Sequence, residues 1–405
     1  MKLSKYIFPL FALFVLFADE LFYSFVALTG SELQSGMKSR EAIVIAAIAF
    51  TMLLLDIVNG RLSSRNWKQL LALLVILVLY VVTGFLYPHD SIYERYVAYL
   101  LTYGAISVPA GYVGMRLARE RCKDELFKLL PFVIVPVVFI VFLAIRSSAV
   151  SGALLGWGDE DVFNYQNASY YMSFCYAYCF FYVFLMGNDK YVRPVGKGKK
   201  VVMFLLMFVS AIGCLVGGGR GAFVFIVLIT AYLIWRSLHQ RGKNNAGTVI
   251  LLVAASVAMV LLSSQLQIFE SAGFERVSGS LTSDEYRMEF MRKALDSFRD
   301  SPIIGHGVGS IWWEVGFYSH NMVTDLLVEV GAIGTLIMLY VLIKMLVSLM
   351  KSSKFDSLDM FMLVVFLGAL VHDTFSGYWI ASSKFFLMFG YVYAKKQTTR
   401  LTLAA

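Results

Sequence analysis

The chain has 405 residues, of which 59% are hydrophobic and only 15% are charged, and its formal net charge is +8. Globular proteins carry about 25% charged residues, so this composition excludes a soluble enzyme and indicates a polytopic membrane protein. Because a transmembrane helix needs about 20 residues, the apolar segments leave no room for a large soluble domain. We therefore treat residues 1–405 as a single integral membrane domain with an all-α fold.

Twelve apolar segments are candidate transmembrane helices. In chain order they span residues 6–28, 42–58, 70–86, 93–113, 129–145, 170–186, 201–216, 222–235, 249–266, 321–349, 358–371 and 380–393. Lys2 and Lys5 precede the first segment, but no small-residue cleavage site follows it, so we interpret it as a signal anchor. Few polar residues separate the last two segments, so a re-entrant pair is the alternative there.

Lys and Arg residues predict the orientation. With the N-terminus inside, 23 of them fall in inner segments and 10 in outer segments. Inner loops of membrane proteins are enriched in these residues, so both termini are predicted to be cytoplasmic. The positive net charge then reflects topology and contact with anionic membrane lipid, and we expect no nucleic-acid partner.

The four cysteines agree with this topology. Cys122 falls in an inner loop, and Cys175, Cys179 and Cys214 lie within apolar segments, so none is positioned for an external disulfide. Cys175 and Cys179 share a helix face but have no His or carboxylate neighbours in the sequence, so we expect no metal site there.

Two external loops are long, whereas most connections are short. Residues 146–169 contain the acidic run 159–161, and residues 267–319 form a larger loop between the ninth and tenth helices. Residues 282–285 have the form of a capping box, and Pro302 ends the segment that follows it. The larger loop is therefore predicted to contain a helix.

A helical wheel divides that loop helix into two faces. Its apolar arc contains Tyr286, Phe290, Met291, Ala294, Leu295 and Phe298. Its polar side contains Glu289, Arg292, Lys293, Asp296 and Arg299. Arg287 lies in the middle of the apolar arc, where a cation is costly unless an anionic group meets it. The alternatives are an Arg that snorkels along the membrane surface or one that pairs with a loop carboxylate.

A second external Arg occurs in a glycine-rich turn, residues 217–221, before the eighth predicted helix. Arg220 would stand at the outer N-terminus of that helix, where free backbone N–H groups and the helix dipole attract anions. The Arg fork suits phosphate oxygens, and the glycines would let a ligand approach the backbone. A tight hairpin without a ligand is the alternative.

The start of the tenth predicted helix contains the third element. His320 would occupy its first turn, where the dipole favours a neutral imidazole that can act as a base. Asn321, Asp325 and Glu329 follow at four-residue spacing and form a polar stripe in an apolar helix. Carboxylates in such positions are functional candidates, although hydrogen bonds between helices are the alternative explanation. We expect Gly331 and Gly334 to allow close helix packing.

The two Arg residues suit a diphosphate, and the His suits the acceptance of a proton. The sequence has no Asp-rich cluster of the kind expected for a divalent metal at a nucleotide-sugar site. It therefore favours a lipid-linked diphosphate donor at the outer leaflet, with no metal and no cofactor.

At these residues the sequence resembles the O-antigen polymerase and ligase family of bacterial membrane glycosyltransferases. The matching motifs are Gly-Arg-Gly-Ala at 219–222, Arg287 followed by Ala-Leu at 294–295, Ser-Pro-Ile-Ile-Gly-His-Gly at 301–307, His-Asn at 320–321 and Glu-Val-Gly-Ala-Ile-Gly at 329–334. Each motif alone is loose, but their order and spacing together are specific. The layout of about twelve helices with a large late external loop extends the resemblance to the whole chain.

The resemblance implies a GT-C-like helical fold and an inverting, metal-independent transfer with undecaprenyl diphosphate as the leaving group. Arg220 and Arg287 would hold the diphosphate of the donor glycan, and His320 would activate or orient the acceptor hydroxyl. Asp373 resembles an acidic position of the ligases. His306 replaces a variable residue and stays outside the catalytic set. The protein would lie in the bacterial inner membrane with its active site facing the periplasm.

Within the family we favour the polymerase, which transfers a growing glycan to the next lipid-linked repeat unit. The ligase, which transfers the glycan to lipid A core, is the close alternative, followed by a protein-glycosylating relative. A chain-length regulator and a flippase are candidate partners of a polymerase. A flippase for the same lipid-linked sugar is the alternative from another class, but the two halves of the sequence show no repeat of the kind expected for a carrier. Asp19 and Glu20 would line a cavity or mark an irregular helix.

Overall fold

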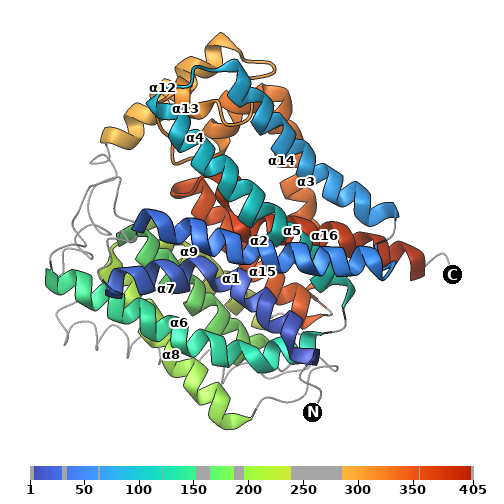
Figure 1. The fold of residues 1–405 in the computed structure, drawn as a ribbon. Helices are drawn as coiled ribbons and strands as arrows, with labels where there is room; N and C mark the ends of the chain where they lie inside the picture. The colour runs from blue at the N-terminus through green and yellow to red at the C-terminus, as the bar shows by residue number, and fades with distance from the viewer. Residues whose placement is uncertain are drawn as a thin grey trace. The chain divides into compact units, whose positions relative to one another are not determined.

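The computed structural model describes residues 4–29, 34–62, 64–120, 122–151, 165–186, 196–238, 285–354 and 356–402 (Figure 1). These ranges consist mainly of helices joined by turns and loops, and they contain no strand. Among the described residues, seven helices are long and apolar enough to cross a membrane. The predicted all-helical membrane fold is therefore confirmed for this part of the chain.

Each predicted segment except the ninth coincides with a helix. The ninth, 249–266, lies outside the described residues, as do residues 152–164 and 267–284 of the two predicted external loops. The helices are generally longer than the apolar runs, because polar residues continue them at their ends. The helix that contains residues 129–145, for example, runs over Lys123–Ser151.

The chain divides into two compact units. The first contains α1 (Ser4–Thr29), α6 (Lys123–Ser151), α7 (Tyr165–Phe180) with the π-helical turn η3 (Phe181–Leu185), α8 (Lys197–Gly217), α9 (Arg220–Leu238) and most of α15 (Ser357–Phe375). The second contains α2 (Gln34–Val58), α3 (Ser64–Leu86), α4 (Ser91–Thr102), η1 (Tyr103–Ser107), α5 (Val108–Arg119), α12 (Glu285–Asp300), α13 (Ile311–Glu314), α14 (Met322–Ser352), the end of α15, η7 (Trp379–Ala381) and α16 (Ser383–Thr402).

The core of the first unit surrounds α7, which packs against α8 and α9. Gly213 of α8 lies against Met172, and a Cβ atom there would be 2.9 Å from that side chain. Cys175 and Cys179 are buried in this core and form no disulfide bond. Glu20 is buried in α1, which runs without interruption, so the irregular helix considered for Asp19 and Glu20 does not form.

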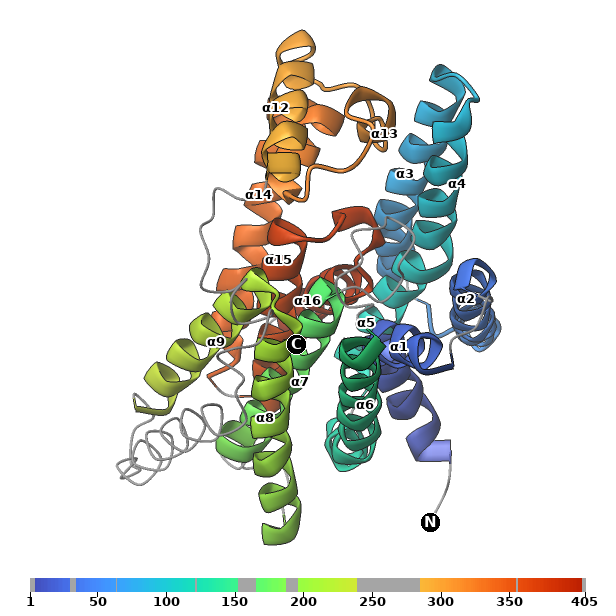
Figure 2. The same ribbon diagram turned by 90° about the vertical axis from the view of Figure 1, so that its left-hand side faces the viewer.

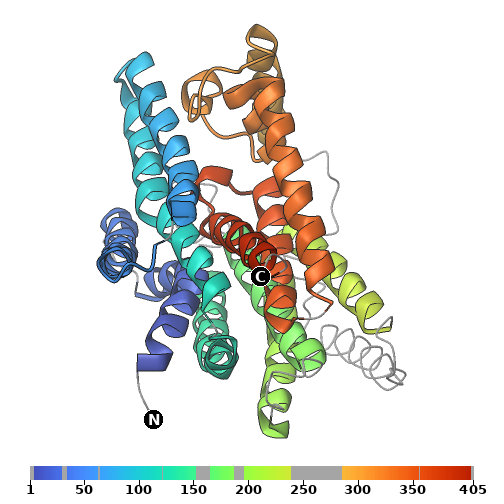
Figure 3. The same ribbon diagram turned by 90° about the vertical axis from the view of Figure 1, so that its right-hand side faces the viewer.

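In the second unit, α5 packs closely against α16. A Cβ atom on Gly114 would be 2.8 Å from the carbonyl carbon of Leu387, and one on Gly390 would be 2.8 Å from that of Gly111. Small residues thus let the two helix backbones approach, as in other membrane helix pairs. Helices α3 and α4 run side by side in the same unit, and α12 lies beside α13 (Figures 2 and 3). Helix α13, which lies between α12 and α14 in the chain, also packs against α4.

Candidate active site

The turn that carries His320 is held by Asp325 of α14. Oδ1 of Asp325 accepts hydrogen bonds from the backbone N–H and the hydroxyl of Ser319, at 2.8 and 2.6 Å. Asn321 directly precedes α14, and its Oδ1 accepts a hydrogen bond from the N–H of Val323 at 2.9 Å, as a helix-capping residue does. These two members of the predicted polar stripe therefore fix the position of the His320 turn.

His320 itself lies before the helix. The helix begins at Met322, and the φ of His320 is 58°, in the left-handed region that an α-helix excludes. The prediction that His320 occupies the first helical turn is therefore wrong. Its Nδ1 is 3.4 Å from the carbonyl oxygen of Ser376, and its ring lies 4.5 Å from the ring of Tyr318 and 5.5 Å from that of Phe317.

Arg287 lies on the inner face of α12. Its side chain is half-buried, and Ala294, two turns further along the same face, is fully buried. Nη1 of Arg287 donates a hydrogen bond to the carbonyl oxygen of Phe375, at 3.3 Å. Arg292 is exposed, so the predicted difference between these two Arg residues is present. Leu295 was placed on the apolar arc but is exposed in the structure.

Residues 372–377 form a closed turn at the end of α15. The backbone N–H groups of Ser376 and Gly377 both donate to the carbonyl oxygen of His372, at 2.8 Å. Asp373 is buried, and its Oδ1 is 2.9 Å from Nδ1 of His372. A buried carboxylate in this position fixes the orientation and tautomer of an imidazole, as in catalytic triads.

Three of the predicted site residues thus meet at this turn. Arg287 contacts the carbonyl of residue 375, His320 lies beside the carbonyl of residue 376, and Asp373 lies in the turn itself. These residues come from α12, from the segment before α14 and from the end of α15. The arrangement places an Arg fork and an imidazole at backbone carbonyls of a turn that also contains a buried carboxylate.

Glu329 is a buried hydrogen-bond acceptor deeper in α14. Its Oε1 accepts from the hydroxyl of Tyr378 and from the backbone N–H of Gly309, the latter at 3.1 Å, and its Oε2 accepts from Nε1 of Trp379 at 3.1 Å. Burial raises the pKa of the Tyr378 hydroxyl well above its ordinary value, and the neighbouring carboxylate raises it further. Tyr378 therefore stays protonated and donates, and Glu329 ties the segment after α15 to α14.

Helix α14 is interrupted at Gly331, whose φ is 62° and ψ −172°. Residues 302–307 pack against the interruption, and the N–H groups of His306 and Gly307 donate to the carbonyls of Val328 and Glu329, both at 2.8 Å. The N–H of Ala332 donates to the carbonyl of Pro302 at 2.9 Å. Gly331 thus makes a close backbone contact as expected, but with residues 303–305 and not with a second helix. For Gly334, the nearest atoms to a Cβ belong to Val330 of the same helix.

Arg220 belongs to the first unit, whereas Arg287, His320 and Asp373 belong to the second. Gly218 ends α8 with a φ of 76°, and the N–H of Gly219 donates to the hydroxyl of Ser169 at 2.9 Å. Arg220 is then the first residue of α9, and its side chain is half-buried. The predicted turn and helix start are therefore present at this residue.

The sequence patterns did not predict several residues that support the site. Tyr378 and Trp379 bind Glu329 from about 50 positions away, and no local pattern connects them. Ser319 lay within the motif that singled out His320, but its bonds to Asp325 could have been expected only from a capping pattern. Among the described residues, no group of three or more His, Cys, Asp or Glu side chains could hold a metal ion.

Comparison with known protein families agrees with the sequence motifs. Residues 205–339 match the family model described as O-antigen ligase. The matched region runs from α8 into α14 and includes Arg220, Arg287 and His320, whereas Asp373 lies outside it. No curated protein matches the chain. The region from 205 to 339 is therefore similar to the O-antigen ligase family, which agrees with the resemblance predicted from the sequence.

Proposed function

We propose that the protein is a glycosyltransferase that moves a glycan from undecaprenyl diphosphate to an acceptor hydroxyl at the periplasmic face of the bacterial inner membrane. The observation that carries this proposal is the meeting of Arg287, His320 and Asp373 at residues 372–377. Two of these residues lie in the region that matches the O-antigen ligase family. The third residue, Asp373, is predicted from a weaker resemblance to the ligases and lies in the turn of residues 372–377.

The proposed step is an inverting substitution that needs no metal ion. The acceptor oxygen forms a bond to the anomeric carbon, and the bond from that carbon to the diphosphate oxygen breaks with its electron pair on the diphosphate. His320 takes the acceptor proton at Nε2, because an Nδ1–H that faces the carbonyl of Ser376 makes Nε2 the acceptor nitrogen of the neutral imidazole. Arg287 stabilises the negative charge that develops on the diphosphate.

Asp325, Asn321 and Glu329 act through the geometry of this site. Asp325 and Asn321 hold the turn that precedes α14, and Glu329 anchors the segment after the turn of residues 372–377. Arg220 as a second diphosphate contact remains a prediction from sequence, and Arg220→Ala tests it by loss of transfer.

The acceptor distinguishes two candidate activities. We favour the polymerase, whose acceptor is the next lipid-linked repeat unit, because residues 319–334 resemble the unbroken polymerase form. The ligase is the second candidate, since the matching family is described by that activity. A chain-length regulator and a flippase would be partners of the polymerase.

Two Arg residues on opposite faces of α12 provide the sharpest test. Removing one positioned donor to developing charge costs about 100-fold or more in rate, so Arg287→Ala should reduce glycan transfer by at least that factor. His320→Ala should do the same. Arg292→Ala is the matched control, because its side chain is exposed on the same helix, and it should retain most activity. Equal losses at Arg287 and Arg292, with equal membrane abundance, would contradict the assignment.

The assay uses purified protein with lipid-linked repeat units, and it measures longer glycans and released undecaprenyl diphosphate. Absence of both products would exclude a transferase and favour a carrier. Lipopolysaccharide from a deletion strain then separates the two activities. If the deletion strain makes lipopolysaccharide core with a single repeat unit, the missing activity is a polymerase. If it makes core without repeat units and accumulates lipid-linked polymer, the missing activity is a ligase.

A further inference from the structure

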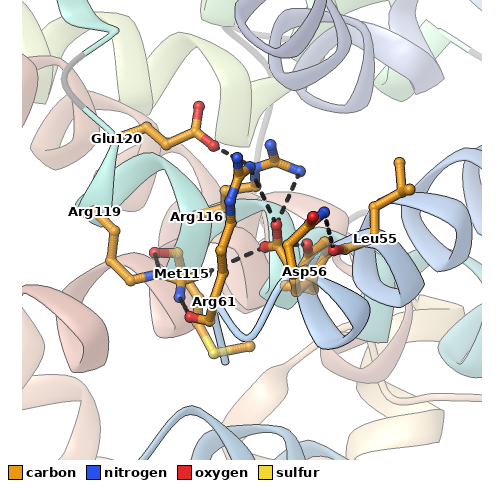
Figure 4. Close-up of polar contacts among 9 residues, drawn as sticks. Leu55, Asp56, Arg61, Met115, Arg116, Arg119 and Glu120 are labelled. Atoms are coloured by element: carbon orange, nitrogen blue, oxygen red, sulfur yellow. Dashed lines mark hydrogen bonds and ion pairs between the residues drawn. The ribbon is translucent and has the colours of Figure 1, made fainter. Parts of the chain in front are cut away.

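A cluster of Arg side chains surrounds a buried carboxylate away from the site described above. Asp56 of α2 is only 3% exposed, and its Oδ2 accepts a hydrogen bond from the hydroxyl of Tyr112 at 2.8 Å. Guanidinium nitrogens of Arg61, Arg116 and Arg119 lie 3.9, 3.9 and 3.7 Å from its oxygens (Figure 4). We call these three residues the Arg cluster.

The backbone fixes the Arg cluster in place. After α2 ends at Val58, the N–H of Arg61 donates to the carbonyl of Asp56 at 2.8 Å. Nη1 of Arg119 donates to the carbonyl of Arg61 at 3.3 Å, and the side chain of Arg116 pairs with Glu120 (Figure 4). The end of α2 and the end of α5 are therefore tied together by charged groups.

Arg61 is the exposed member of the Arg cluster. Its guanidinium lies near the buried carboxylate of Asp56, and the guanidinium groups of Arg116 and Arg119 lie near the same carboxylate (Figure 4). The nitrogen–oxygen distances to Asp56 exceed the roughly 2.7–2.9 Å of a charge-assisted hydrogen bond. The Arg61 side chain is 64% exposed, so its planar fork is accessible from outside the protein.

The surface beside Arg61 is apolar. Leu54, Leu55, Ile57 and Val58, at the end of α2, are all exposed. In a membrane protein, such side chains face lipid tails, and Arg residues just beyond them lie at the level of the headgroups. The predicted topology puts the segments around Arg61 and Arg119 on the cytoplasmic side, where anionic lipids attract basic residues.

We propose that the Arg cluster binds the phosphate of an anionic phospholipid in the cytoplasmic leaflet. Arg61 provides the exposed fork, Arg116 and Arg119 add positive charge behind it, and Asp56 keeps the three side chains together. The acyl chains lie along the exposed apolar end of α2. The apolar surface favours a lipid over free phosphate, because free phosphate has no apolar part that could contact this surface. The proposal is independent of the glycosyltransferase assignment.

The test measures lipid binding to the purified full-length protein in detergent. Phosphatidylglycerol, phosphatidylcholine or inorganic phosphate is added to the protein. Native mass spectrometry then measures how much of each ligand is retained, and thermal unfolding measures the change in Tm. Phosphatidylglycerol should be retained and should raise Tm more than phosphatidylcholine. Arg61→Ala should weaken its apparent affinity about tenfold, because the variant loses the specific charge-assisted hydrogen bonds to the phosphate, and such a loss corresponds to about 1.4 kcal/mol or more. Arg61 is exposed, so this variant should fold.

Lys68→Ala is the matched control. Lys68 is an exposed cation in the same predicted cytoplasmic segment, and it makes none of the ion pairs seen among the described residues. This variant should keep the wild-type affinity within twofold. Equal losses for Arg61→Ala and Lys68→Ala would overturn the proposal, because they would indicate general surface attraction. Displacement of phosphatidylglycerol by an equal concentration of inorganic phosphate would overturn the assignment to lipid.

Discussion

The contact between Gly305 and the interrupted part of α14 gives a prediction whose size can be estimated. Gly305 has a φ of 70°, and a Cβ atom there would be 2.5 Å from the backbone nitrogen of Gly331 and 2.6 Å from the carbonyl carbon of Glu329. These are backbone atoms within a helix, so they cannot rotate away as a flexible side chain could. Gly305→Ala must therefore separate residues 302–307 from α14.

Two costs add up in this variant. An alanine in the left-handed region costs about 1 kcal/mol. Separation also weakens the hydrogen bonds from His306 and Gly307 to the carbonyls of α14, and each contributes about 1 kcal/mol to stability. We expect Gly305→Ala to lower the free energy of unfolding by about 3 kcal/mol. Gly316→Ala is the control, because Gly316 has a φ of 86° but nothing within 4 Å, and it should lose only about 1 kcal/mol.

Thermal unfolding of the two purified variants in the same detergent measures this difference. The Tm of Gly305→Ala should fall clearly further than that of Gly316→Ala. Glycan transfer should also fall in Gly305→Ala, because residues 302–307 support the half of α14 that contains Asp325. Equal decreases in Tm would refute the steric argument and leave backbone strain as the whole effect.

Substitutions at two buried carboxylates separate hydrogen bonding from charge. Glu329→Gln turns one carboxylate oxygen into a donor and leaves a buried donor such as Nε1 of Trp379 without an acceptor, so it should cost about 1–3 kcal/mol and lower Tm; an unchanged Tm would exclude the proposed anchoring role. Asp325→Asn retains an oxygen that can accept both bonds from Ser319, so transfer should stay within a few-fold of wild type, whereas Asp325→Ala releases the His320 turn and should lose most activity. If Asn and Ala reduced transfer equally, the charge of Asp325 would be essential.

The sequence predicted best what depends on neighbouring residues. Long apolar runs identified the membrane helices, because only backbone hydrogen bonds within a helix satisfy polar groups in lipid. The helical repeat placed Arg287 on an inner face and Arg292 outside, and the structure agrees at both residues. The same wheel misplaced Leu295, because the apolar arc is wider than the surface that α12 buries.

Contacts between distant segments could not be predicted. The pairing of Glu329 with Trp379 depends on how the chain returns after α15, and nothing near either residue encodes it. The left-handed φ of His320 occurs just before α14, beside the bonds of Ser319 to Asp325, so it could be expected only once the start of that helix was known. Counting basic residues gave Arg61 a role in topology alone, and its position beside Asp56 emerged only from the fold.

The burial of the polar residues separates support from chemistry. Asp325 and Glu329 are fully buried, and they accept hydrogen bonds that hold the surrounding segments in place. Arg287 and His320 are half-buried and contact neutral backbone carbonyls of one turn. One turn, residues 372–377, therefore positions both the proposed diphosphate contact and the proposed proton acceptor, while the buried Asp325 of α14 holds the segment that carries His320.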